Sequence, residues 1–166
     1  QDYPNGVHSS GIDNALKGED GFGLYNNYAG KPVIGVYHWV DDQEVALIAR
    51  RTLEARFVFV TLLDQQGNFS RNASAGEGPR LYSTLNDDPT SEPVLHAALH
   101  AAKSFRVRDV RKYARSKMDL DSPALRSAIA IPIRLHGLSI GAILAFGKQD
   151  GIFFSEEDES LANLLA

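Results

Sequence analysis

Residues 125–146 carry two segments in which large apolar side chains recur at every second position, and this pattern constrains the fold most. In the first segment they recur from Ile129 to Leu135, and in the second from Leu138 to Phe146. Side chains of a strand alternate between its two faces, so a period of two predicts two strands. The His136-Gly137 pair between them supplies a tight turn, because glycine accepts a positive φ. The sequence therefore predicts an antiparallel hairpin.

A helix is predicted after the hairpin and a short loop at residues 147–151. Ser155 and Asp158 have the spacing of a capping box, in which each side chain bonds the other residue's backbone N–H. The acidic residues Glu156 and Glu157 suit the positive end of the helix dipole. This part of the chain therefore predicts a sheet with one face buried under one helix.

The runs SAIAIPI and IGAILAF, followed by GK and FFSEEDESLANLLA, resemble the C-terminal half of a GAF domain. GAF domains are PAS-like sensory modules, usually non-enzymatic, that bind small molecules beside an antiparallel sheet. The resemblance implies an α+β fold over residues 42–166, with a PAS/GAF-like antiparallel sheet and flanking helices. Some members carry Asn-Lys, then Phe, three residues and Asp-Glu. The matching positions here are Gly147-Lys148, Phe154 and Asp158-Glu159, with glycine in place of asparagine.

We interpret the motif residues that match, other than the replaced asparagine, as structural. An ion pair between Lys148 and Asp158 would tie the last strand to the last helix, and most such lysine–carboxylate pairs have no further role. Phe154 and Glu159 belong to the same motif and are expected at the same junction.

The other elements of residues 42–166 follow from periodicity and propensity. Residues 41–55 predict a leading helix, since apolar residues recur at helical spacing behind Asp41, although they could also finish a preceding strand. Residues 57–63 are apolar on both faces and predict a central strand. The remaining expectations are a half-exposed strand at 68–75, a loop at 76–93, a helix at 93–103, a short strand at 105–109 and mainly loop at 110–123.

Residues 1–41 predict a separate fragment, with a short helix at 11–17 and strands at 21–28 and 31–40. Their pattern Tyr-x-Asn-Tyr-x-Gly-x-Pro-Val-Ile-Gly resembles the closing strands of an extracytoplasmic Cache domain. In that family a membrane helix normally follows, and none follows here. The chain also begins without Met and ends within a helical pattern, so we expect a piece of a longer protein.

Composition excludes several classes of function. The chain has no cysteine, which excludes disulfides, thiolate metal sites, cysteine nucleophiles and bilins attached through cysteine. Its net charge of −4 argues against a nucleic acid partner. No apolar run reaches the roughly 20 residues of a membrane helix, and the first residues are not a signal peptide. We expect a cytoplasmic location.

A basic run is the first candidate binding site: Arg106, Arg108, Arg111, Lys112, Arg115 and Lys117. In a GAF-like fold this segment borders the ligand cavity. The resemblance therefore implies that Arg106 and Arg111 could hold a carboxylate or a phosphate, since guanidinium groups bind both in two-pronged fashion. The same spacing also fits a solvated loop.

Two histidines form the second candidate. His96 and His100 are four residues apart, on one face of the helix predicted at 93–103. Such a pair can share a metal, and one histidine could ligate a haem, but no third ligand has a suitable spacing. We expect no metal and no cofactor, and place the pair beside the cavity or on the surface.

Apolar side chains could wall a cavity between the sheet and residues 76–124: Phe57, Phe59, Phe69, Phe105, Tyr82, Tyr113 and Ile131. Most of them would instead be ordinary core. The ligand contacts that we predict are Phe59, Tyr82, His96, Arg106, Arg111, Tyr113 and Ile131.

The sequence lacks a nucleophile elbow and a glycine-rich phosphate loop, so we do not expect an enzyme. The leading hypothesis is a small-molecule-binding sensory domain of a signal-transduction protein, such as a two-component system. Its ligand would shift the first and last helices, through which we expect a homodimer. A kinase, cyclase or DNA-binding output domain would lie outside this chain. The alternative is a dimerisation spacer without a ligand.

Overall fold

The computed structural model describes residues 9–15, 17, 21–27, 29–37, 42–87, 92–113, 116, 118, 120–151 and 153–164. The chain forms two compact units, residues 1–41 and residues 42–166. Each unit has its own secondary structure, and each is described by itself.

The smaller unit is a helix with a two-stranded hairpin: α1 (Ser10–Ala15), β1 (Gly21–Asn26) and β2 (Pro32–Tyr37). The strands pair antiparallel, from Gly21 with Tyr37 to Asn26 with Pro32. These elements confirm the predicted helix and hairpin, although residues 38–40 of the second predicted strand lie outside the described residues. Tyr25 packs against Gly35, where a Cβ atom would lie 2.5 Å from the tyrosine hydroxyl.

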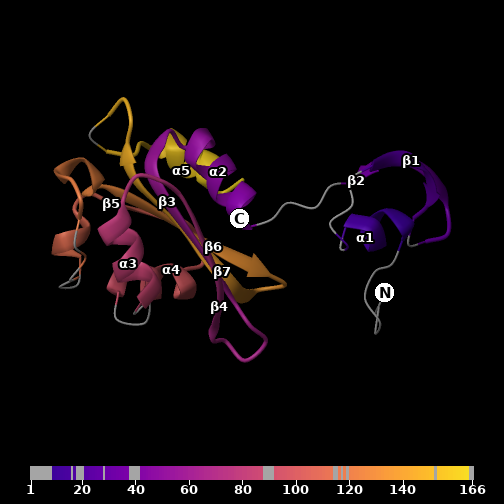
Figure 1. Cartoon of the computed structure of the whole chain (residues 1–166), viewed down its shortest axis with the longest axis horizontal. Helices are drawn as coiled ribbons and strands as arrows, with labels where there is room; N and C mark the ends of the chain where they lie inside the picture. Colours follow the sequence, from indigo (N-terminus) through magenta and orange to yellow (C-terminus); the bar gives the residue numbers. More distant parts are fainter. Residues whose placement is uncertain are drawn as a thin grey trace. The chain divides into compact units, whose positions relative to one another are not determined.

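The larger unit is built on a five-stranded antiparallel sheet in the order β4-β3-β7-β6-β5 (Figure 1). The predicted hairpin is confirmed, with Ala128 opposite Phe146 and Leu135 opposite Leu138. His136 and Gly137 make its turn with positive φ angles of 50° and 84°. The strands are β3 (Ala55–Leu63), β4 (Phe69–Gly76), β5 (Phe105–Val107), β6 (Ala128–Leu135) and β7 (Leu138–Lys148).

Helices cover both faces of this sheet (Figure 1). One face packs under α2 (Asp42–Thr52) and α5 (Glu156–Ala162), and the other under α3 (Pro79–Asp87) and α4 (Pro93–His100). The helix predicted over one face of the hairpin is α5, and the strand predicted to be apolar on both faces is β3, which is covered on both sides. Alternation sends large residues such as Ile129 toward α2 and α5, and the small residues between them, such as Ala130, allow the second helix pair to pack on the reverse face.

The predicted loop at 76–93 contains helix α3, so that prediction was wrong. Proline is tolerated in the first turn of a helix, and Leu81 and Leu85 are buried one turn apart. The carboxylate of Asp121 accepts hydrogen bonds from the backbone N–H groups of Arg80 and Leu81 at 3.2 Å. This contact with a residue about forty positions away stabilises the helix start and leaves no local signal.

Smaller differences lie near the predicted binding segment. Helix α4 ends at His100 and strand β5 ends at Val107, each earlier than predicted. Two 3-10 turns follow β5, at Val110–Lys112 and at Pro123–Leu125. Among the described residues, no helix combines the length and the apolar character that a membrane span requires.

Candidate functional site

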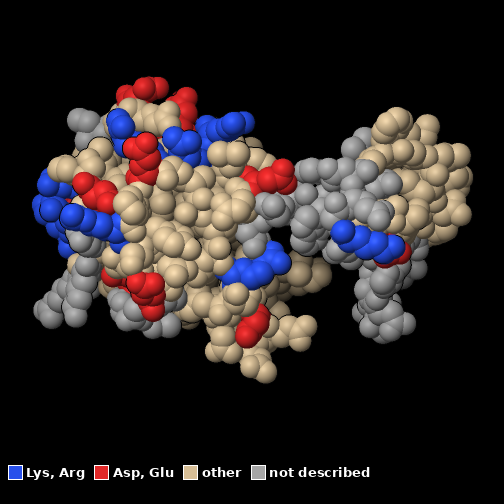
Figure 2. All heavy atoms as spheres, viewed as in Figure 1, with Lys and Arg blue, Asp and Glu red and all other residues tan. Residues whose placement is uncertain are grey.

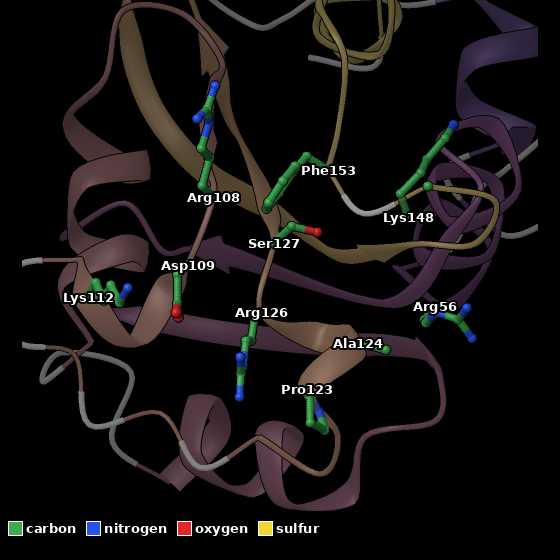
Figure 3. A pocket seen from close by; sticks show the side chains of 11 residues that line it. Arg56, Arg108, Asp109, Lys112, Pro123, Ala124, Arg126, Ser127, Lys148 and Phe153 are labelled. Atoms are coloured by element: carbon green, nitrogen blue, oxygen red, sulfur yellow. The ribbon is translucent and has the colours of Figure 1, made fainter.

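A half-open groove of about 630 Å³ lies where β6 begins and β7 ends (Figure 3). Its volume is in the range of pockets that bind small molecules. Figure 2 shows lysine and arginine side chains gathered at the edge of the larger unit where Figure 1 places β5 and the segment after it. We call this site the basic groove, and its polar and aromatic lining consists of Arg56, Arg108, Asp109, Lys112, Arg126, Ser127, Lys148 and Phe153.

Strand pairing positions the floor of the basic groove. The last residue pair between β5 and β6 is Val107 with Ala128. Arg108, which follows Val107, and Ser127, which precedes Ala128, lie just beyond this pair. Strand side chains alternate between the two faces, so both side chains lie on the face opposite to that of Val107. Helix α5 covers this opposite face. The N–H of Gly147 donates to the Ser127 carbonyl at 2.8 Å, and the N–H of Val110 donates to the Arg126 carbonyl at 2.9 Å.

Ser127 is the most unusual residue of the groove. It is only 2% exposed, yet its hydroxyl has no hydrogen-bond partner in the part of the chain that the structure describes. Figure 3 shows it at the centre of the lining residues, with Oγ directed between Phe153 and Lys148. A buried hydroxyl without a partner costs free energy. A bound group that accepts from this hydroxyl would therefore recover that cost.

Gly147 lies near the end of β7, directly before the groove residue Lys148. Its φ is +66°, and a Cβ atom at this position would lie 2.4 Å from the carbonyl oxygen of Ala124. Only glycine fits both conditions, because any side chain would collide with backbone. This contact explains why glycine occupies the asparagine position of the motif. Further along the chain Phe153 is half exposed, with its ring 5.8 Å from the guanidinium carbon of Arg108.

Lys148 connects the basic groove to both terminal helices. Its Nζ lies 2.9 Å from Asp158 Oδ1 of α5 and 2.8 Å from Glu54 Oε2, just after α2, and it donates to the Leu53 carbonyl at 3.3 Å. The predicted ion pair is confirmed. Burial lowers the pKa of Lys148, but the hydrogen bonds and charges of Glu54 and Asp158 outweigh it, so the pKa is raised.

The predicted capping box is confirmed as well. Ser155 Oγ accepts from the N–H of Asp158 at 3.2 Å, and Asp158 Oδ2 accepts from the N–H of Ser155 at 2.7 Å. Burial raises the pKa of Asp158, but bonds from Ser155 and Lys148 outweigh it and the pKa is lowered. Phe154 is buried in the core under α2 and α5.

The two arginines that we predicted as ligand contacts hold carboxylates of the protein. Arg106 Nε lies 2.6 Å from Glu159 Oε2 of α5, which ties the edge strand β5 to that helix. The side chain of Arg111 reaches Asp109 at 3.5 Å, and the Arg111 N–H donates to the same carboxylate at 3.1 Å. Burial raises the pKa of Asp109, but these bonds outweigh it and the pKa is lowered. Arg115 and Lys117 lie outside the described residues.

The predicted aromatic wall is divided between the two faces of the sheet. Phe59 is fully buried and meets Tyr82 edge to face at 6.1 Å, on the side of α3 and α4. Tyr113 stacks on Phe105 at 6.0 Å on the same side. Ile131 lies on the opposite face, against α2 and α5, so it cannot share a wall with the others. That these residues contact a ligand stays a prediction.

The two histidines lie away from the basic groove. His96 and His100 are exposed on α4 with their rings stacked at 4.3 Å, beside a pocket of about 380 Å³ that Phe69 also lines. Within the ranges that the structure describes, they belong to no group of three or more residues able to hold a metal.

Sequence reasoning missed Arg56, Arg126, Ser127 and Phe153. They come from three segments far apart in the sequence, and nothing in the spacing of these segments indicates that they meet. The local signal for Ser127 is only its place directly before a buried strand.

Residues 43–166 match the GAF domain family model. No curated protein matches the chain. Three similar solved structures show the same fold. A GAF domain/HD domain protein from Geobacter sulfurreducens has a TM-score of 0.54 and 19% identity, covering 74% of this chain and 82% of that one. The GAF domain of an Acinetobacter phosphoenolpyruvate-protein phosphotransferase has a TM-score of 0.55 and 17% identity, with coverage of 75% and 74%.

The third is a type II free methionine-R-sulfoxide reductase from Thermoplasma acidophilum, with a TM-score of 0.50, 21% identity, and coverage of 75% and 86%. GAF domains are generally sensory and regulatory domains of signalling proteins, and this reductase shows that the fold also occurs in enzymes. The family match begins at residue 43, so the Cache-like interpretation of residues 1–41 stays a prediction. Since the match spans 43–166 and the fold agrees with it, the chain belongs to the GAF domain family.

Proposed function

We propose that residues 42–166 form a small-molecule-binding regulatory domain of a signalling protein. Its ligand occupies the basic groove, and binding is read through α2 and α5. The family supports a regulatory role, and the volume of the groove supports a small ligand.

The observation that carries this proposal is the position of Lys148. Its side chain lines the groove, and the same ammonium group holds Asp158 of α5 and Glu54 just after α2. An anion in the groove competes with these two carboxylates for Lys148. Occupation of the groove therefore changes how strongly both helices are held to the sheet.

This coupling has a thermodynamic condition. A ligand shifts a conformational equilibrium only by the difference in its affinity for the two states. The two states here differ in whether Lys148 bonds the helices or the ligand. A ligand that does not displace Glu54 and Asp158 from Lys148 would bind without changing how the two helices are held.

We propose binding without catalysis. A serine nucleophile needs an adjacent base, and the Ser127 hydroxyl has no hydrogen-bond partner among the described residues. Histidine is not among the side chains that line the basic groove.

Exposed apolar residues on the terminal helices support the predicted homodimer. On α2, Leu47 and Ile48 are 39% and 48% exposed. Leu161 in α5 is 41% exposed, and Leu164, just after this helix, is 81% exposed. We propose that these faces pair between two copies in the cytoplasm, with the output domain elsewhere in the protein.

A dimerisation spacer without a ligand is the second candidate. It is favoured by the filled interior under α3 and α4, where Phe59 and Tyr82 pack together. This candidate predicts that no small molecule binds the basic groove.

The melting temperature of the full chain, measured with a panel of small anions, cations and neutral compounds, tests the proposal. A ligand stabilises by mass action, so one class of anion should raise the melting temperature. The double variant Arg56→Gln/Arg126→Gln should lose this increase. The variant His100→Gln should keep it, because His100 lines the separate pocket beside α4. If no class raises it, or if the double variant responds like the parent chain, the groove is not the binding site.

A further inference from the structure

We propose that the basic groove binds the phosphate group of a small organic phosphate, whose ring lies against Phe153. This inference rests on the proposed function and names the chemical class of its ligand. It depends on the charge of the groove, on the hydroxyl of Ser127 and on the exposed ring.

The charge of the groove calls for an anion of more than one charge. Five cationic side chains line it and one carboxylate, Asp109, accompanies them. Lys148 is balanced by Glu54 and Asp158, and Asp109 is bonded to Arg111. The positive potential of such a cluster concentrates anions at this place.

The other four cations have no ion pair with a carboxylate in the described ranges: Arg56, Arg108, Lys112 and Arg126. The side chain of Arg56 donates to the carbonyl oxygen of Gln149 at 3.1 Å. Each of the four is more than a third exposed, so its long side chain is able to turn toward a ligand. Arginine binds phosphate in two-pronged fashion and lysine binds it as a point charge.

The arrangement of donors favours phosphate over carboxylate. Ser127 lies between cations from three segments, whose side chains extend from it in different directions: Arg56 on β3, Arg108 and Lys112 at and after the end of β5, and Arg126 before β6 (Figure 3). A tetrahedral phosphate directs three oxygens to different sides, whereas a planar carboxylate directs only two in one plane. The buried hydroxyl gains the partner that the described part of the protein does not provide.

Phe153 supplies a surface for the rest of the ligand. Its ring is 49% exposed, and it lines both the basic groove and an adjoining pocket of about 330 Å³. Arg108 lines both spaces as well. A planar group can pack against the ring of Phe153 while its phosphate reaches Arg108 and Ser127.

Four probes test the assignment by calorimetry on the full chain: phenyl phosphate, inorganic phosphate, phenol and benzoate. We expect phenyl phosphate to bind most tightly and inorganic phosphate more weakly, because it lacks the ring. Phenol and benzoate should bind weakest. The second pKa of a phosphate monoester is about 6, so the affinity should fall between pH 7.5 and pH 5.

Two variants connect binding to the named residues. Arg108→Gln and Ser127→Ala should each lower the affinity for phenyl phosphate by about tenfold, which corresponds to the loss of one hydrogen bond to a charged group. Arg71→Gln is the charge-matched control, since Arg71 pairs with Leu62 near the far end of β3 from Arg56. Ser127→Ala loses only an unpaired hydroxyl and should fold.

Equal affinity for benzoate and phenyl phosphate, or an affinity for phenyl phosphate that does not change with pH, overturns the phosphate assignment. If another anion binds and Arg108→Gln weakens it, the proposed function stands with a different ligand class. If none of the probes binds and no compound of the melting panel does, both proposals are wrong.

Discussion

At the scale of single residues, two positions of the site are unusual. Gly147 holds a positive φ where a side chain would collide with the Ala124 carbonyl oxygen, and Ser127 buries a hydroxyl without a partner among the described residues. Such exceptions to the ordinary rules of folding are expected at functional sites.

The cost of Ser127 is measurable. Ser127→Ala should raise the free energy of unfolding by about 1 kcal/mol in the absence of ligand, because it removes an unsatisfied buried hydroxyl. Urea denaturation gives this value.

Ser104→Ala is the matched control. Ser104 is also buried, but its Oγ donates to Asn163 Oδ1 at 2.9 Å. Its loss should lower the free energy of unfolding by about 1 kcal/mol. A similar loss in Ser127→Ala would show that its hydroxyl has a structural partner, against our account.

At the scale of elements, the junction of β7 with α5 combines local and distant contacts. The capping box is local, so the spacing of Ser155 and Asp158 was sufficient to predict it. The pairing of Lys148 with Asp158, ten positions apart, was predicted from a short motif. The contact of Lys148 with Glu54 joins distant segments and had no signal in the sequence.

The rest of the fold divides in the same way. The hairpin of β6 and β7 followed from alternation and from the glycine of its turn. Helix α3 was missed because its start is stabilised by Asp121, far along the chain. The basic groove was predicted only in part: Arg108 and Lys112 belong to the predicted basic run, but the other lining residues come from segments that only the sheet brings beside it.

The ion pair of Lys148 and Asp158 predicts a pH dependence of stability. The pKa of Asp158 is lowered from 3.8, so its contribution is present above that value and is lost as the pH falls through the folded-state pKa. The pKa of Lys148 is raised from 10.5, so its contribution is complete below that value and is lost above it. Between these limits the pair stabilises the junction.

The free energy of unfolding, measured from pH 6 to pH 2.5, tests whether the Lys148–Asp158 ion pair stabilises the protein in this pH-dependent way. Asp158→Asn should lower it by about 1.5–3 kcal/mol at pH 6, since a charged hydrogen bond is lost. The difference between the parent chain and the variant should shrink as the pH falls below 3.8. A constant difference across this range would mean that the charge of Asp158 does not stabilise the junction.

At the scale of the whole molecule, the larger unit combines a sheet with two helices whose ends the ammonium group of Lys148 contacts together. The sheet buries both faces, so its core has little freedom to respond to a ligand. The junction around Lys148 contacts the basic groove on one side and the terminal helices on the other. We therefore propose that the edge of the sheet recognises the ligand and that the two helices respond to it.

Hydrogen exchange of the backbone amides in α2 and α5, with and without phenyl phosphate, tests this central claim most directly. We predict that the ligand changes exchange in both helices of the full chain, and that Lys148→Met removes this change while phenyl phosphate still protects the segment around Arg108 and Ser127. Lys103→Met, at an exposed lysine outside the groove, should behave as the parent chain. If the ligand protects the groove while α2 and α5 exchange as before, the basic groove is not coupled to the terminal helices, and the regulatory mechanism is wrong.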